Sequence, residues 1–212
     1  MKSIIIGAGT YGEVYLYYLQ EAGFEIIGFL DDNKELWNTK VQEVPVLGGL
    51  ELLEELNSSG VKAVFCPLGN NKLRVQFLSK AKALGYLTPN YIHPSVYISP
   101  HVSISDEGVY ILPNVTIMPS VHIDKYVMIS VGANIVHHSV LKEGVFISNG
   151  VNLGASLLAD KLAYVGMGAT VMTGVQFLGK ECLIGAGAVV IKNVPDKAIM
   201  AGVPAKVIRI KD

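Results

Sequence analysis

Two adjacent histidines, His137 and His138, are the side chains best suited to proton transfer in this sequence. The pKa of an unperturbed imidazole is about 6.5, so the ring can take up and release a proton near neutral pH. The pair occupies the third and fourth positions of a six-residue unit that begins at Ile135. We expect these positions to flank a turn of the chain and to project outward, where a neighbouring subunit can meet them. The alternative is a pair of ordinary surface histidines.

A glycine-rich segment near the N-terminus has the spacing of a phosphate-binding loop. Residues 7–12 read Gly-Ala-Gly-Thr-Tyr-Gly, which matches G-x-G-x-x-G, and Asp31 follows nineteen residues after the last glycine. Such glycines let the backbone approach a phosphate, and the N-terminus of the following helix attracts negative charge. Asp31 or Asp32 could accept hydrogen bonds from a ribose or a base. The alternatives are a tight turn without a ligand and a solvated acidic strand end.

The first 88 residues alternate strand and helix patterns. We predict strands at residues 4–6, 25–30 and 61–65, and helices at residues 12–23, 50–56 and 71–84, the last capped by Asn70 or Asn71. This alternation predicts a small parallel sheet covered by helices, an abbreviated Rossmann-like α/β domain. The domain is about half as long as a full dinucleotide-binding fold. We therefore expect a mononucleotide, and an NAD-dependent oxidoreductase is the competing interpretation of the glycine loop.

From about residue 92 a six-residue apolar period replaces the helix signals. Counting in sixes from Ile111, every position is apolar: Ile117, Ile123, Ile129, Ile135, Leu141, Ile147, Leu153, Ala159, Val165, Val171, Phe177, Leu183 and Val189. Four residues after each of these the side chain is usually small or β-branched, with Glu181 and Asn193 as exceptions. Ile92, Ile98 and Ile104 keep the period one residue out of phase, which predicts an insertion within residues 105–110.

A period of six predicts a parallel β-helix, in which three six-residue units form one triangular coil. Each unit supplies one flat side and one corner, with its large aliphatic residue pointing inward. We therefore predict that residues 89–212 form a β-helix with a C-terminal tail and a coil spacing of about 4.8 Å. A β-sandwich, the competing fold, needs turn signals at an irregular spacing of about 8–12 residues.

Composition excludes several classes of function. Hydrophobic residues make up 50% of the chain and charged residues 17%, yet no apolar stretch approaches the roughly 20 residues of a membrane-spanning helix. The net charge is −1 without a long basic run, so nucleic-acid binding has no electrostatic support.

Cys66 and Cys182 are isolated in apolar surroundings, and we expect buried thiols. The N-terminus lacks a signal-peptide cleavage site, and we expect a cytoplasmic protein.

The histidines do not have the spacing of a metal site. His122 and His137 are 15 residues apart, whereas a separation of 18 would stack them in consecutive coils. No cluster of Asp, Glu or His completes a tetrahedral set of ligands. We therefore expect no metal.

The chain resembles the NeuD/PglD-type sugar acyltransferases of bacterial surface-glycan and sialic-acid pathways over nearly its whole length. The resemblance rests on the glycine loop at residues 5–12, Gly28-Phe29-Leu30-Asp31-Asp32, Leu68-Gly69-Asn70-Asn71 followed by Arg74, Ile92-His93-Pro94, and Ala201-Gly202-Val203-Pro204-Ala205-Lys206. It implies a left-handed β-helix that assembles as a homotrimer, with acetyl-CoA in the groove between two β-helices. It also implies that residues 1–88 hold the nucleotide of a UDP-sugar.

The activity that the resemblance implies is acetyl transfer from acetyl-CoA to the amino group of a nucleotide-linked sugar, with a UDP-4-amino-trideoxy sugar as the expected acceptor. The alternatives are O-acetylation of a sugar or of sialic acid, and a catalytically weakened nucleotide-sugar-binding homologue. The expected substrate-binding residues are Gly9, Thr10, Tyr11, Gly12, Asp31, Asp32, Gly69, Asn70 and Asn71. Tyr11 and Phe146 replace histidines found in family members, which bears on the identity of the substrate.

In the family, a histidine at the position of His137 is the general base, and this chain departs from the pattern beside it. The next position usually carries a carboxylate that orients the imidazole. Here that position is His138, which we also expect in the catalytic site. Asp124 or Glu143 could supply the missing acid.

The thioester and the coenzyme arm need contacts of their own. A backbone N–H of Gly154 or Ala155, one coil above His137, is the candidate donor to the oxyanion that develops on the thioester carbonyl. The pantetheine arm is expected to pass Met167 and the small residues Gly166, Gly168, Gly185, Ala186 and Gly187. Lys206 could meet a coenzyme phosphate. The alternatives are that the small residues merely suit tight corners and that Lys206 is a solvated lysine.

Overall fold

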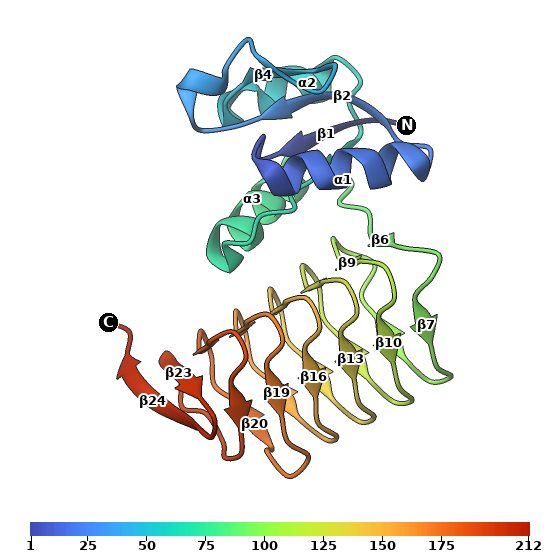
Figure 1. The fold of residues 1–212 in the computed structure, drawn as a ribbon. Helices are drawn as coiled ribbons and strands as arrows, with labels where there is room; N and C mark the ends of the chain where they lie inside the picture. The colour runs from blue at the N-terminus through green and yellow to red at the C-terminus, as the bar shows by residue number, and fades with distance from the viewer. The chain divides into compact units, whose positions relative to one another are not determined.

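The computed structural model describes residues 1–212, which divide into two compact units, residues 1–90 and residues 91–212 (Figure 1). Each unit has its own sheets. No helix in either unit is both long enough and apolar enough to cross a bilayer.

The N-terminal unit is an α/β domain built on one sheet. Its elements are β1 (Lys2–Ile6), α1 (Thr10–Glu21), β2 (Glu25–Leu30), the 3₁₀ helix η1 (Lys34–Leu36), β3 (Lys40–Val41), β4 (Val44–Gly48), the 3₁₀ helix η2 (Leu50–Leu52), α2 (Leu53–Ser58), β5 (Ala63–Phe65) and α3 (Asn71–Ala83). The strand order is β3-β4-β2-β1-β5, and every pair is parallel except β3–β4. Ile4, Ile5 and Ile6 are almost inaccessible, as expected for a central parallel strand.

The three predicted strands and three predicted helices of this unit are present, and the β3–β4 hairpin was not predicted. Pro45 lies in β4 and lacks the N–H that a central strand needs. It is accommodated because it pairs with Lys40 of the short edge strand β3. Val44 and Val46 are buried in alternation with Pro45, which is the pattern of a half-buried strand.

The C-terminal unit is a parallel β-helix whose two-residue strands stack into three flat faces (Figure 1). Face 1 contains β6 (Tyr91–Ile92), β9 (Tyr110–Ile111), β12 (Met128–Ile129), β15 (Phe146–Ile147), β18 (Tyr164–Val165), β21 (Leu183–Ile184), β23 (Ala198–Gly202) and β24 (Ala205–Ile210). Face 2 contains β7 (Tyr97–Ile98), β10 (Thr116–Ile117), β13 (Asn134–Ile135), β16 (Asn152–Leu153), β19 (Thr170–Val171) and β22 (Val189–Val190). Face 3 contains β8 (Ser103–Ile104), β11 (His122–Ile123), β14 (Val140–Leu141), β17 (Leu158–Ala159) and β20 (Phe177–Leu178). This architecture confirms the predicted fold class.

The corners of the coil have a regular backbone conformation. Every sixth residue adopts a positive φ between 56° and 70°: Asn114, Ser120, Tyr126, Gly132, His138, Gly144, Gly150, Ser156, Leu162 and Gly168. Glycine adopts this left-handed conformation without strain, and asparagine and histidine are enriched in it relative to other residues. The small residue that follows each corner, such as Ala133 or Val145, is buried. The repeat therefore reflects one backbone turn and two inward side chains per unit, one just after the corner and one in the strand.

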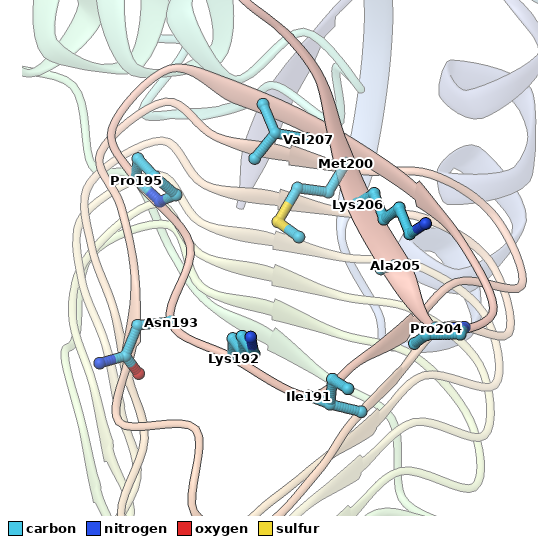
Figure 2. A pocket seen from close by; sticks show the side chains of 9 residues that line it. All are labelled: Ile191, Lys192, Asn193, Pro195, Met200, Pro204, Ala205, Lys206 and Val207. Carbon is cyan, nitrogen blue, oxygen red and sulfur yellow. The ribbon is translucent and has the colours of Figure 1, made fainter.

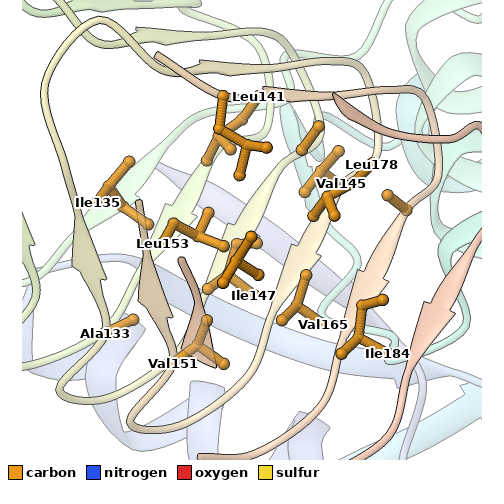
Figure 3. Close-up of a cluster of buried hydrophobic side chains, with 14 of the residues drawn as sticks. Ala133, Ile135, Leu141, Val145, Ile147, Val151, Leu153, Val165, Leu178 and Ile184 are labelled. Atoms are coloured by element: carbon orange, nitrogen blue, oxygen red, sulfur yellow. The ribbon is translucent and has the colours of Figure 1, made fainter. Parts of the chain in front are cut away.

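Aliphatic side chains from all three faces meet inside the coil (Figure 3). Ile135 and Leu153 come from face 2, Leu141 from face 3, and Ile147 and Val165 from face 1. Each is 1% exposed or less. Burying a side chain of this size contributes roughly 1.5–3 kcal/mol, so the stacked interior is the main source of stability of this unit.

The predicted inward series is correct up to Val171 and wrong for its last three members. Phe177, Leu183 and Val189 are only partly buried, whereas the following residues, Leu178, Ile184 and Val190, are 0% exposed. Strand pairing shows the cause, because β17 and β20 pair with a separation of 19 residues. The same shift removes the two exceptions at Glu181 and Asn193, since Cys182 and Val194 are the buried residues. The insertion predicted within residues 105–110 is confirmed by the separation of 19 between β6 and β9.

Candidate active site

The two predicted histidines lie on the edge between face 2 and face 3, here called the histidine edge. Its stacked corner pairs are Pro119–Ser120, His137–His138 and Ala155–Ser156. The N–H of His138 donates to the carbonyl of Pro119 at 3.2 Å, and the N–H of Ser156 donates to the carbonyl of His137 at 3.0 Å. The hydroxyl of the buried Ser139 donates to the carbonyl of Gly154 at 3.1 Å. These hydrogen bonds therefore fix the backbone positions from which the two imidazoles project.

The two imidazoles contact each other directly. The Nδ1 atoms of His137 and His138 are 3.0 Å apart, and the ring planes are nearly perpendicular at 88°. His137 is half-buried and His138 is exposed. Because a neutral imidazole carries one N–H and one bare nitrogen, one Nδ1 donates and the other accepts. The Nε2 of His137 is left for another partner.

Neither candidate for the missing acid contacts His137. Asp124 accepts a contact from Nε2 of His122 at 3.1 Å and forms an ion pair with Lys142 at 3.7 Å. Glu143 forms ion pairs with Lys125 at 3.6 Å and Lys161 at 3.1 Å. Both carboxylates therefore neutralise lysines in neighbouring coils, and the partner of His137 is His138.

The two candidate oxyanion donors differ in availability. The N–H of Gly154 donates to the carbonyl of Val171 at 2.9 Å within the strand ladder, so it is already used. The N–H of Ala155 contacts the hydroxyl of Thr173 at 3.3 Å, a long bond to a group that can rotate. A Cβ on Gly154 would lie 2.5 Å from the backbone nitrogen of Thr173, which explains the glycine by coil packing. Ala155 is therefore the better candidate.

The predicted coenzyme residues lie elsewhere on the β-helix. Met167–Gly168 and Ala186–Gly187 are corners on the edge between face 1 and face 2, stacked through a 2.8 Å bond from Gly187 N–H to the Met167 carbonyl. Gly166 and Gly185 lie beside this edge on face 1. A Cβ on Gly166 would lie 2.7 Å from the carbonyl oxygen of Ile184, so packing alone requires this glycine. One chain does not bring these residues to the histidine pair.

A pocket lies at the C-terminal end of the histidine edge (Figure 2). Here residues 191–194 cross from β22 on face 2 to a bridge with Leu178 on face 3. The pocket has a volume of about 370 Å³ and includes Ile191, Lys192, Met200 and Lys206 in its lining. Sequence reasoning found Lys206 and missed the rest, because the pocket forms only where the chain leaves the regular coil.

The N-terminal unit has a pocket beside the glycine loop. Its volume is about 180 Å³. It is lined by Ile6, Gly7, Asp31, Asp32, Leu68, Leu73 and Phe77. Of the nine predicted substrate-binding residues, only Asp31 and Asp32 line it. Leu73 and Phe77 of α3 were missed, because only the fold places them beside the glycine loop.

Asp31 has a structural role in this pocket. Its carboxylate accepts hydrogen bonds from the N–H groups of Ala8 and Asn33, both at 2.8 Å. It therefore holds the glycine loop to the end of β2 and occupies one of the loop's amides with negative charge. The Ala8 amide is therefore not available to the phosphates of a nucleotide, whether NAD or a nucleotide sugar. Asp32 is exposed and makes no hydrogen bond, so it is the carboxylate available to a ligand.

The remaining predicted substrate residues lie around the pocket without lining it. Gly9 is exposed and precedes α1, and Tyr11 stacks on Tyr15 with ring centroids 6.3 Å apart. Asn70 caps α3, since its side chain accepts a hydrogen bond from the N–H of Leu73 at 3.2 Å. The other four are Thr10 and Gly69, both exposed, and Gly12 and Asn71, both buried.

Both cysteines are buried, and neither forms a disulfide. Burial raises the pKa of the Cys66 thiol to about 12, and it does the same for Cys182. We expect iodoacetamide at pH 8 to label neither thiol in the native protein and both in urea, as read by mass spectrometry. As pH rises from about 9 toward 12, the unfolded chain loses these protons before the native one, so the free energy of unfolding should fall. Rapid labelling of native Cys66 or Cys182 at pH 8 would contradict their burial.

The structure also bears on metal binding. No three His, Cys, Asp or Glu side chains are arranged to hold a metal ion. Asp124, which contacts His122, also pairs with Lys142, a cation that cannot serve as a metal ligand. No acidic side chain bonds to the His137–His138 pair.

Comparison with known proteins agrees with this architecture. The family model of the PglD N-terminal domain matches residues 2–81. GDP-perosamine N-acetyltransferase from Caulobacter crescentus, solved with CoA and GDP-perosamine, superposes with a TM-score of 0.91 at 31% identity, covering 98% of this chain and 96% of the other. The acetyltransferase domain of PglB from Neisseria gonorrhoeae, solved with acetyl coenzyme A, gives 0.86 at 27% identity and 98% of both chains. WeeI from Acinetobacter baumannii shares the fold, with a TM-score of 0.87 at 22% identity over 98% of this chain and 100% of the other.

These similarities and the histidine edge define an acyltransferase of the left-handed parallel β-helix class, which uses acetyl-CoA as its co-substrate. The chain belongs to the NeuD/PglD-type sugar acyltransferases.

Proposed function

We propose that the protein transfers the acetyl group of acetyl-CoA to the amino group of a sugar linked to a nucleoside diphosphate, with His137 as the general base. The observation that carries the base assignment is the half-buried imidazole on the histidine edge, whose Nδ1 is engaged by His138. The similar GDP-perosamine N-acetyltransferase has been solved with one histidine replaced by alanine and by asparagine.

In the proposed step a C–N bond replaces the C–S bond of the thioester, and one proton moves from the amine to the coenzyme thiolate by way of His137. The amine nitrogen bonds to the thioester carbonyl carbon and gives a proton to Nε2 of His137. The C–S bond then breaks, and the coenzyme thiolate takes up the proton from the His137 imidazolium. The N–H of Ala155 is the donor that we assign to the carbonyl oxygen.

We propose that the coenzyme extends along the histidine edge toward the pocket at residues 191–207. Lys192 and Lys206 are exposed in its lining and supply positive charge for the phosphates. The corners Met167–Gly168 and Ala186–Gly187, on the edge between face 1 and face 2, would join this site only from a neighbouring subunit. The proposal therefore includes the homotrimer that the family resemblance implies.

In this proposal residues 1–88 bind the nucleotide and residues 89–212 carry out the transfer. Asp32 and the apolar lining of the 180 Å³ pocket are the contacts that we assign to the nucleotide. A UDP-4-amino-trideoxy sugar is the acceptor expected from the family resemblance, and a GDP-linked amino sugar is the alternative favoured by the relative solved with GDP-perosamine.

An acceptor panel tests the proposal. The protein is incubated with acetyl-CoA and with UDP- and GDP-linked 4-amino sugars, and their 4-hydroxy counterparts serve as matched controls. We expect a mass gain of one acetyl group on an amino sugar, in a product that resists hydroxylamine as an amide does. A hydroxylamine-labile product on the hydroxy sugars would indicate O-acetylation. Absence of transfer to every acceptor would overturn the proposal.

A further inference from the structure

We infer that His138 is a positioning residue that selects the working tautomer of His137. The inference rests on the proposed role of His137 as the base. The two Nδ1 atoms lie 3.0 Å apart, which leaves room for one proton between them and not for two. The position of that single proton decides which nitrogen of His137 is bare.

Two arrangements of the neutral pair are possible, and only one of them works. When the proton is on Nδ1 of His137, its Nε2 is bare and can accept a proton from the amine. When the proton is on Nδ1 of His138, His137 carries its own proton on Nε2 and cannot accept another. His138 therefore supports the reaction only as an acceptor at Nδ1, with its own proton on Nε2.

The backbone holds His138 in place for this contact. Its φ of 60° is the left-handed corner conformation, and the corner is stacked between those of Ser120 and Ser156. The buried hydroxyl of the next residue, Ser139, ties this corner to the coil above. The ring planes meet at 88°, so the two imidazoles contact each other edge-on and are not stacked.

No carboxylate bonds to the pair, so each imidazole has the other as its hydrogen-bond partner. The titratable and charged groups nearby are His101, a corner residue one coil before Ser120, and the mutually bonded His122, Asp124 and Lys142 on face 3. Uptake of one proton by the pair, on either ring, removes the bare Nε2 of His137. A second proton would place two N–H groups against each other and break the contact.

Two substitutions at the corner test this role. His138→Gly keeps the left-handed backbone and removes the acceptor, and we expect kcat to fall roughly 10–100-fold with little change in KM. His138→Glu supplies a group that only accepts, and we expect it to restore kcat. It should also move the acid limb of the pH profile, which is the fall in kcat at low pH, to higher pH, because a carboxylate stabilises the His137 imidazolium. His122→Asn, on the adjacent face, is the matched control with unchanged kcat.

The tautomer itself can be observed by ¹⁵N NMR of labelled histidine. We expect the Nδ1–H form of His137 in the native protein and in His138→Glu, and a larger share of the Nε2–H form in His138→Gly. Unchanged kcat, acid limb and tautomer in a folded His138→Gly protein would overturn the inference, as would a His138→Glu protein no better than His138→Gly. If His137→Asn retained full activity, the proposed function of His137 would fail instead, and the two failures are distinguishable.

Discussion

Replacing His137 with asparagine is expected to lower kcat by roughly 10²–10⁴-fold, the range that a positioned general base contributes. An amide cannot take the proton from the attacking amine, whereas the KM for acetyl-CoA should change little because the proposed coenzyme contacts do not include the side chain of His137. The free energy of unfolding should stay within about 0.5 kcal/mol, because the side chain of His137 bonds only to the exposed His138. Release of the coenzyme thiol and a urea titration measure the two quantities.

The matched control is His122→Asn. His122 is also an imidazole on the β-helix surface, and it already has a carboxylate partner in Asp124. Retained activity in this variant and lost activity in His137→Asn would separate the base from a general effect of histidine loss. The reverse result would show that the oriented imidazole at residue 122 is the base.

Gly12→Ala is expected to destabilise the protein by about 4 kcal/mol or more, at the upper end of single substitutions. A Cβ at this position would lie 1.9 Å from the carbonyl oxygen of Gly7 and 3.3 Å from the ring of Phe29. The clash is with backbone, so the start of α1 must move away from the end of β1. A urea titration followed by circular dichroism measures the loss.

Gly9→Ala, in the same loop, is the control for that experiment. A Cβ on Gly9 meets nothing within 4 Å, and its φ of −81° is open to any residue. We expect a change of at most about 1 kcal/mol, since Gly9 precedes the helix and alanine is a poor cap there. Equal effects of the two substitutions would show that close packing of helix and strand is not the reason for Gly12.

The β-helix could be predicted because every unit of the coil repeats the same backbone turn. The inward position of each unit admits only an apolar side chain, so the period is visible without an alignment. The shift after Val171 was harder to predict, because Phe177–Leu178 and Leu183–Ile184 are apolar in pairs and satisfy the pattern in both registers. The exceptions at Glu181 and Asn193 were its only sequence signal, and the pairing of β17 with β20 shows it directly.

The histidine pair could be predicted for a related reason, since its place in the repeat put both residues beside a corner. The contact between their Nδ1 atoms could not, because it depends on side-chain torsions. The structural role of Asp31 could not be predicted from the sequence either. Its bond to the N–H of Ala8 exists because β1 and β2 pair in parallel and end side by side. Likewise, the pocket at residues 191–207 forms where the chain stops repeating.

The most direct test of the central claim is a crystal structure with coenzyme A and an amino-sugar nucleotide bound. We expect the amine nitrogen within about 3.2 Å of Nε2 of His137, a hydrogen-bonding distance for a base and the proton it removes. The coenzyme sulfur should lie on the same edge of the β-helix. An amine bound beside His122, or a sugar held far from the histidine edge, would contradict the account.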